Sequence, residues 1–164
     1  MQKTCVMALC ALMAVADAAA CNLSTGTTPF AAGERPSSPA DDGVLKAPVL
    51  ELVSVTRGVD GRASCDASGL LTLNVEWPRG TDYKVRDLGF EFRVVDGVDA
   101  LSIFPSQPVS GRVDGRRSEF VFLWRDGPPS QQSRIDLTVE VRAVTADNRR
   151  GPPAQLRVAS APGG

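Results

Sequence analysis

The chain has 164 residues, with 18 Lys and Arg against 19 Asp and Glu, no His, and 43% hydrophobic residues. This length and composition suit one globular domain, and the near balance of charge gives no general attraction to nucleic acid. Without His, the chain cannot build a Ser-His-Asp or Cys-His catalytic arrangement or a His-ligated metal site.

Residues 1–20 have the pattern of a secretory signal segment. Lys3 precedes an apolar run from Cys5 to Ala16, and Asp17 and small residues follow. The run is shorter than the roughly 20 apolar residues that a membrane-spanning helix needs. We therefore expect this segment to be removed and the protein to be exported.

A cysteine follows small residues at the end of this segment. The run Ala18-Ala19-Ala20-Cys21 resembles the lipobox of bacterial lipoproteins, although Ala18 stands where that family usually has Leu. The resemblance implies cleavage before Cys21, acylation of this residue with fatty acids such as palmitate, and attachment to a membrane of the bacterial envelope. Asn22 in the next position resembles the pattern of outer-membrane lipoproteins. The same residues also fit an ordinary cleavage site, which would leave a freely secreted protein.

The mature chain would keep two cysteines, Cys21 and Cys65. If Cys21 is lipidated, Cys65 is a single thiol. If Cys21 is free, the two can form a disulfide that closes a long loop. Two cysteines alone cannot hold a structural zinc, and we expect neither a metal nor a cofactor.

Residues 21–46 are rich in Ser, Thr, Gly, Pro and Ala, with prolines at Pro29, Pro36 and Pro39. Such a stretch has too little apolar surface to offset the entropy of an ordered chain. It is therefore expected to be a disordered linker between Cys21 and the folded domain.

From residue 47 to residue 160, apolar and polar residues alternate with a period of two, which is typical of half-buried strands. The alternation is clearest in Gly69–Trp77, Asp87–Val94 and Arg134–Val144, and weaker strands are expected at Val49–Thr56, Leu101–Phe104, Glu119–Trp124 and Gln155–Ala159. Asp-Gly pairs between these segments favour turns. The pattern predicts an all-β domain, a single antiparallel β-sandwich of about seven strands, followed by a short tail at 161–164.

Several segments of this domain resemble the fibronectin type III family of the immunoglobulin-like class. Trp77-Pro78 lies where that family has its core Trp, and Leu137–Val144 followed by Gly151-Pro152-Pro153 resembles its sixth strand and the approach to its seventh. The chain departs from the family at Leu137, where the Tyr of the tyrosine corner is usual. The resemblance implies a seven-stranded sandwich over most of residues 47–160.

The acidic residues of the Asp-Gly pairs are interpreted as turn formers rather than as catalytic acids. These residues are Asp60, Asp96, Asp114 and Asp126. Two groups of arginines, Arg112 with Arg116 and Arg117, and Arg149 with Arg150, are expected in solvated loops or, alternatively, on a surface for an acidic glycan or for lipid headgroups. No nucleophile stands in a catalytic motif, so we expect no enzyme activity.

The run Phe120-Val121-Phe122-Leu123-Trp124 is apolar on both faces of its predicted strand. If Phe120, Phe122 and Trp124 face the core, then Val121 and Leu123 face outward. Either the following Gly127–Ser130 loop covers them, or they form an exposed patch that binds a partner.

Together these patterns predict a non-catalytic envelope lipoprotein, tethered to the membrane through Cys21, which binds or assembles with a protein or a glycan of the envelope. The alternatives are a freely secreted module associated with carbohydrate and, as a further rival, an enzyme with an atypical carboxylate site. The six aromatic side chains that could form a carbohydrate platform are assigned to the core instead: Trp77, Phe90, Phe92, Phe120, Phe122 and Trp124. The sequence predicts no partner by name and no oligomeric state.

Overall fold

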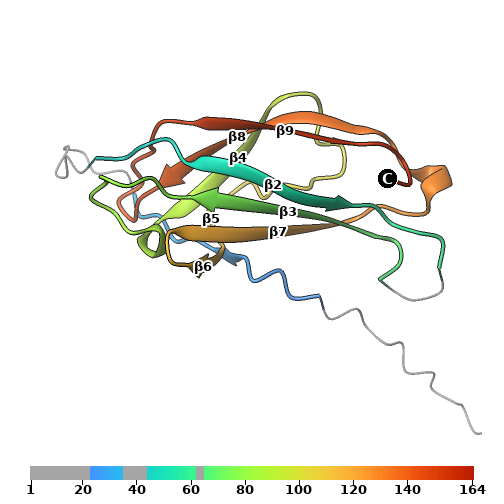
Figure 1. Cartoon of the computed structure of the whole chain (residues 1–164), viewed down its shortest axis with the longest axis horizontal. Coiled ribbons are helices and arrows are strands. Elements are labelled where there is room, and N and C mark those ends of the chain that lie inside the picture. The colour runs from blue at the N-terminus through green and yellow to red at the C-terminus, as the bar shows by residue number, and fades with distance from the viewer. Residues whose placement is uncertain (1–22, 35–43, 62–64) are drawn as a thin grey trace, which may run out of the picture.

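The computed structural model describes residues 23–34, 44–61 and 65–164. Strands run nearly the whole length of the molecule (Figure 1), and two short 3₁₀ turns, η1 (Val85–Asp87) and η2 (Pro129–Gln131), lie between them. The strands are β1 (Thr28–Pro29), β2 (Val49–Thr56), β3 (Ser68–Glu76), β4 (Gly89–Asp96), β5 (Val109–Ser110), β6 (Arg112–Asp114), β7 (Arg117–Arg125), β8 (Ile135–Val144) and β9 (Ala154–Ser160).

These strands form two antiparallel sheets packed face to face. One sheet has five strands in the order β1-β5-β4-β8-β9, and the other has four in the order β2-β3-β7-β6. The predicted all-β sandwich is therefore confirmed. The three strongly alternating segments form the long strands β3, β4 and β8. Alternation allows one face of each strand to pack against the opposite sheet.

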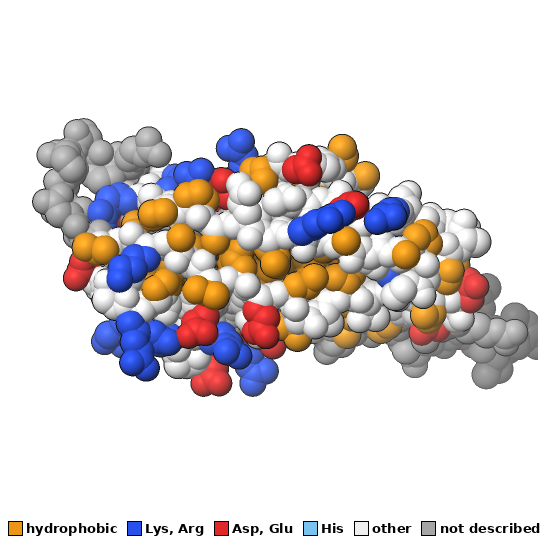
Figure 2. Space-filling view, turned by 45° about the horizontal axis from the view of Figure 1, so that its top comes forward, with side chains coloured by type: hydrophobic (Ala, Val, Ile, Leu, Met, Phe, Trp, Pro, Cys, Tyr) orange, Lys and Arg blue, Asp and Glu red, His pale blue; other side chains and the backbone are white. Residues whose placement is uncertain are grey.

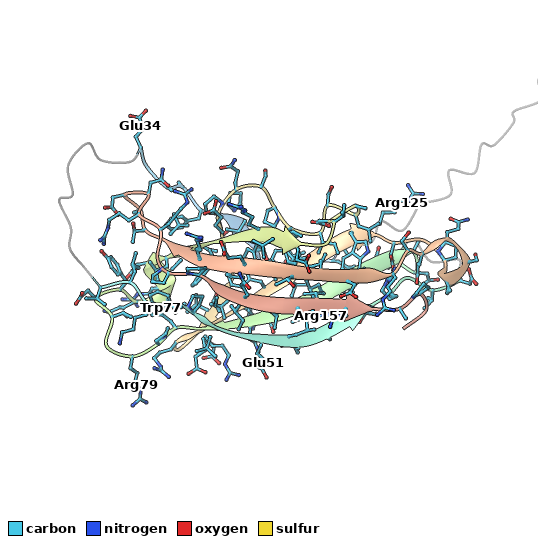
Figure 3. All side chains as sticks on the ribbon, turned by 90° about the horizontal axis from the view of Figure 1, so that it is seen from above. Glu34, Glu51, Trp77, Arg79, Arg125 and Arg157 are labelled. Atoms are coloured by element: carbon cyan, nitrogen blue, oxygen red, sulfur yellow. The ribbon has the colours of Figure 1, made fainter. Side chains whose placement is uncertain are left out.

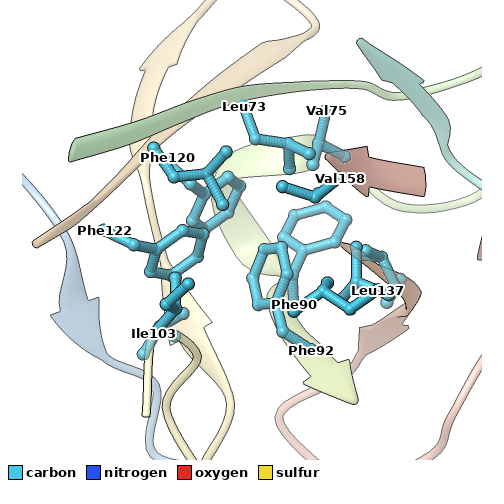
Figure 4. Close-up of a cluster of buried hydrophobic side chains, with 14 of the residues drawn as sticks. Leu73, Val75, Phe90, Phe92, Ile103, Phe120, Phe122, Leu137 and Val158 are labelled. Atoms are coloured by element: carbon cyan, nitrogen blue, oxygen red, sulfur yellow. The ribbon is translucent and has the colours of Figure 1, made fainter. Parts of the chain in front are cut away.

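The core lies between the two sheets and contains most of the aromatic side chains (Figure 4). Phe90 of β4 is fully buried in this core. Its ring centroid lies 5.6 Å from that of Phe120 and 6.2 Å from that of Trp77, both in edge-to-face geometry. Phe92 contacts Phe122 in the same way at 4.9 Å. The aromatic side chains assigned to the core from the sequence are all buried.

A short strand lies inside the segment that the sequence assigned to a linker. Thr28 and Pro29 of β1 pair with Ser110 and Val109 of β5, and the Phe30 amide donates a hydrogen bond to the Pro108 carbonyl at 2.9 Å. The linker expectation is therefore corrected here, because residues 28–30 belong to the sandwich. The signal segment at 1–20 and the remaining linker residues at 35–43 lie outside the described residues.

The strand expected at Leu101–Phe104 is instead a turn. The Asp99 carboxylate accepts hydrogen bonds from the amides of Ile103 at 2.9 Å and Phe104 at 3.1 Å, and Ser102 has a positive φ of 52°. A side chain that binds backbone amides in this way competes with strand pairing. The apolar residues of this turn serve the core instead, since Ile103 is buried and Phe104 stacks on Phe92.

Candidate functional site

Val121 and Leu123 face away from the core on β7, as the sequence predicted. Their partners on β3 are Thr72 and Leu70. Leu123 is 39% exposed, while Val121 is half-buried, and the Thr27 hydroxyl of the N-terminal segment donates a hydrogen bond to the Val121 carbonyl at 3.4 Å. A role in partner binding stays a prediction, because no described residue shows what would occupy this face.

The two cysteines of the expected mature chain are unequally placed. Cys21 lies outside the described residues, whereas Cys65 lies in the β2–β3 loop, three residues before β3, and is disulfide-bonded. The three remaining cysteines of the chain, at positions 5, 10 and 21, all precede the described residues.

The end of the sandwich near Cys65 contains a buried ion pair that the sequence did not indicate. The Arg57 guanidinium donates two hydrogen bonds to the Asp126 carboxylate, at 2.7 and 2.8 Å, and both side chains are almost inaccessible to solvent. Arg57 also donates to the Ser133 carbonyl at 2.9 Å and to the Ala161 carbonyl at 3.1 Å. One side chain thus joins the ends of β2, β7 and β9 and the start of β8.

The ion pair determines the protonation of Asp126. Burial opposes ionisation, but the hydrogen bonds from Arg57 and from the Gly58 amide outweigh it, so the pKa of the Asp126 carboxyl is lower than its usual value. Asp126 precedes Gly127, whose φ of +76° fits the turn expected from the sequence. The ion pair with Arg57 is a second role of Asp126 that the turn interpretation did not include. A carboxylate held in this way stays ionised and cannot donate a proton as a general acid.

Charged side chains cover the outer face of β4 and β8, and they neutralise one another. Cross-strand neighbours there are Glu91 with Arg142 and Arg93 with Glu140. Arg142 forms an ion pair with Glu140 at 2.8 Å, and Arg150 forms one with Glu91 at 2.7 Å. Since opposite charges alternate along it, this face carries little net charge.

A pocket of about 330 Å³ lies at the opposite end of the sandwich, between the loop 77–86 and the β6–β7 turn. Figure 3 shows Trp77 and Arg79 at this end and Arg125 at the other. The apolar part of the pocket lining consists of Trp77, Pro78, Tyr83 and Val85. A volume of this size is at the lower limit of small-molecule sites.

Four cationic side chains and no carboxylate line this pocket. They are Arg79, Lys84, Arg86 and Arg116. Arg79 and Lys84 are exposed and form no ion pair with any described residue, and Arg86 has only a long contact of 3.8 Å with its neighbour Asp87. Arg116 binds Glu76 at 2.7 Å. Figure 2 shows Lys and Arg side chains gathered at the same end of the molecule.

Hydrogen bonds hold the loop of this pocket in place. The Trp77 indole N–H donates to Thr81 Oγ1 at 2.8 Å and to the Tyr83 carbonyl at 3.0 Å. The Tyr83 ring lies 5.6 Å from the Arg149 guanidinium carbon, and its hydroxyl accepts a hydrogen bond from Arg149. The pocket is therefore built on buried or bonded residues, with the cations at its rim.

The sequence analysis found only a part of this site. From the sequence, Arg116 is expected in a solvated loop or on a surface for an acidic glycan or for lipid headgroups, and Trp77 is expected in the core. Arg79, Lys84 and Arg86 are assigned no role. These three residues are scattered along one loop, and Arg116 comes from a distant turn. Only the fold brings the four charges together.

Other kinds of site have less support in the described part of the chain. No three Cys, Asp or Glu residues there are grouped as metal ligands would be. No described helix is long and apolar enough to span a bilayer. Comparisons with protein-family models, with curated proteins and with solved structures found no match to this chain.

Proposed function

We propose that this chain is an exported, non-catalytic β-sandwich that serves as a binding module at the cell envelope. The observation that carries the proposal is the disulfide at Cys65. Disulfides persist in oxidising compartments such as the periplasm and the extracellular space. The apolar segment before Cys21 is the expected signal for reaching such a compartment.

Removal of residues 1–20 would leave Cys21 as the sole partner for Cys65. A Cys21–Cys65 disulfide and lipidation of Cys21 exclude one another, because both use the same sulfur atom. A disulfide between Cys21 and Cys65 would belong to the secreted form and not to the lipid-anchored form. The lipobox-like run Ala18–Cys21 supports the anchored form, which is the second candidate.

The position of β1 changes how an anchored form would work. Only residues 22–27 separate Cys21 from β1, and so short a chain reaches at most about 20 Å. An anchored domain would lie close to the membrane surface instead of extending from it on a long linker. The longer Pro-containing segment lies between β1 and β2 in the sequence, so it cannot increase the distance between the domain and the membrane.

The strand order supports the resemblance to the immunoglobulin-like class. β2-β3-β7-β6 lie opposite β4-β8-β9, which corresponds to the strand order of immunoglobulin-type sandwiches. Sandwiches of this class cluster their loops at the two ends, and in variable domains the loops of one end bind the ligand. The pocket at 77–86 lies at one such end.

The intact mass of the mature protein tests the proposal. The protein should be isolated from the membrane and soluble fractions of its native host, with and without reduction, beside Cys21→Ser and Cys65→Ser variants. We expect a soluble chain that begins at Cys21 and gains two hydrogens on reduction, and we expect neither variant to show this gain.

Two results would contradict the secreted form. Acyl mass on Cys21 that is lost in Cys21→Ser would establish the anchored candidate in its place. A full-length chain that begins at Met1 and stays inside the cell would overturn both forms of the proposal.

A further inference from the structure

We propose that the pocket between the loop 77–86 and the β6–β7 turn binds an anionic sugar unit, whose carboxylate or phosphate is held by Arg79, Lys84 and Arg86. This inference deepens the proposed binding function by naming a ligand class. Its test uses purified protein and does not depend on export, so the two proposals can fail separately.

The distribution of charge around the pocket favours an anionic ligand. The whole chain has a net charge of −1, yet the pocket lining has four cations and no carboxylate. On the outer face of β4 and β8, by contrast, Arg142 and Arg150 form ion pairs with Glu140 and Glu91. Arg79 and Lys84 lack such a partner among the described residues, so their N–H groups are available to a ligand.

The chemistry of these side chains suits a carboxylate or a phosphate. A guanidinium presents parallel N–H donors that match two oxygens of one anion, and a Lys ammonium adds a point charge. Arg79 and Lys84 are on the same loop, on either side of Thr81, whose hydroxyl accepts the Trp77 indole N–H. Because this bond fixes the loop, little conformational entropy is lost when the ligand binds.

The shape of the pocket favours a sugar ring over an acidic peptide. Its volume of about 330 Å³ is sufficient for a compact cyclic unit, with apolar C–H faces against Pro78, Tyr83 and Val85. An extended peptide usually adds to a free strand edge, and this pocket is lined by a loop and a turn instead. The cations at the rim then reach the charged substituent of the ring.

Titration of trigalacturonate into the ¹⁵N-labelled domain tests this proposal. The experiment is followed by amide shifts at low ionic strength, about 20 mM, where screening is weak. The probes titrated for comparison are cellotriose, inorganic phosphate, glucose 6-phosphate, an Asp-rich peptide of equal charge and vesicles with anionic lipid. We expect trigalacturonate or glucose 6-phosphate to shift amides of residues 77–86 and 115–116, and to bind more tightly than every other probe.

Charge reversal shows whether the pocket cations are responsible. Arg79→Glu combined with Lys84→Glu should weaken binding at least about tenfold, the effect of one charge-assisted hydrogen bond. The matched control is Arg125→Glu, an exposed arginine at the opposite end of the molecule (Figure 3). It should change the affinity by less than about twofold, because Arg125 ends β7 at the far end of the sandwich and is not among the residues that line the pocket.

Several outcomes would overturn the proposal. The first is that cellotriose, the peptide, the vesicles or phosphate alone bind as tightly as the anionic sugars or more tightly. The second is that the amide shifts avoid residues 77–86. The third is that the pocket variant and the Arg125→Glu control lose the same affinity. Because the wild-type shift map needs no variant, a failure of the double variant to fold would still leave the ligand class and the location tested.

Discussion

Arg57 and Asp126 show how a single buried pair can hold one end of a sandwich together. The pair is bidentate, and the remaining guanidinium donors reach carbonyls of Ser133 and Ala161. Such complete pairing offsets the cost of removing both charges from water. The arrangement needs each partner, because either charge alone would be buried without compensation.

Asp126→Asn is expected to lower the free energy of unfolding by about 3–5 kcal/mol, because it leaves the Arg57 charge buried without its partner. Urea unfolding followed by Trp fluorescence measures the effect. The control is the double variant Arg57→Met with Asp126→Leu, which removes both charges and should recover most of the loss. If Asp126→Asn is as stable as the parent protein, the ion pair does not support this end of the fold.

At the scale of the element, the N-terminal segment behaves as part of the sandwich. β1 extends the five-stranded sheet beyond β5, and Thr27 reaches the Val121 carbonyl of the other sheet. The segment therefore covers an edge that would otherwise present free backbone groups. Phe30 fixes it, because its ring lies where a side chain on Gly89 would be.

Gly89→Ala is expected to detach β1, because the new Cβ would overlap the Phe30 ring. The unfolding free energy should fall by about 1–3 kcal/mol, the usual cost of overpacking. Hydrogen exchange at the Phe30 amide should become faster, while exchange in β3 and β8 should not change.

The matched background for this substitution is Phe30→Ala. Without the Phe30 ring, Gly89→Ala should lower the free energy of unfolding much less than it does in the parent protein. A double-mutant cycle should therefore give a clear coupling energy between the two positions. Additive effects of the two substitutions would show that Phe30 does not hold the segment through Gly89.

The elements differ in how far the sequence predicts them. β3 and β8 could be found because they alternate over nine or ten residues. β1 has two residues, one of them Pro29, and no alternation, so nothing local distinguishes it from a linker. The turn at 101–104 was mistaken for a strand because its apolar residues contact the core, while the deciding contact is the side chain of Asp99.

The candidate site was harder to predict for the same physical reason. Arg79, Lys84 and Arg86 are separated in sequence by ordinary loop residues, and Arg116 belongs to another turn. Their charges combine only after β3 and β7 pair. Sequence alternation predicted that pairing, but it gave no information on which loop residues would meet at its end.

At the scale of the molecule, the two ends of the sandwich differ in the placement of their charges. One end contains the buried Arg57–Asp126 pair, with its charges neutralised inside the fold. The other end presents exposed cations around an apolar pocket. Since the chain as a whole is slightly acidic, anions meet a favourable field mainly at the pocket end.

Acid should destabilise the whole fold, because arginines lower the pKa of three carboxyls. Arg57 does this for Asp126 against the opposing effect of burial, Arg157 for Asp136, and Arg142 for Glu140. A carboxyl with a lower pKa in the folded state stabilises the fold at pH values above its unfolded pKa, which is about 3.9 for Asp and 4.3 for Glu. This stabilisation is lost as the pH falls through the folded pKa.

The chain has no His, so no side chain of ordinary pKa changes its charge between about pH 5 and pH 8. Thermal unfolding midpoints should therefore be nearly constant over that range and fall steeply below about pH 4. The midpoint of Asp126→Asn should fall less steeply in acid than that of the parent protein, because one linked proton is gone. The midpoint of Arg125→Gln should keep the parental slope, because Arg125 is exposed and forms no ion pair with a described residue. A midpoint at pH 3 equal to that at pH 7 would show that these pairs do not stabilise the fold.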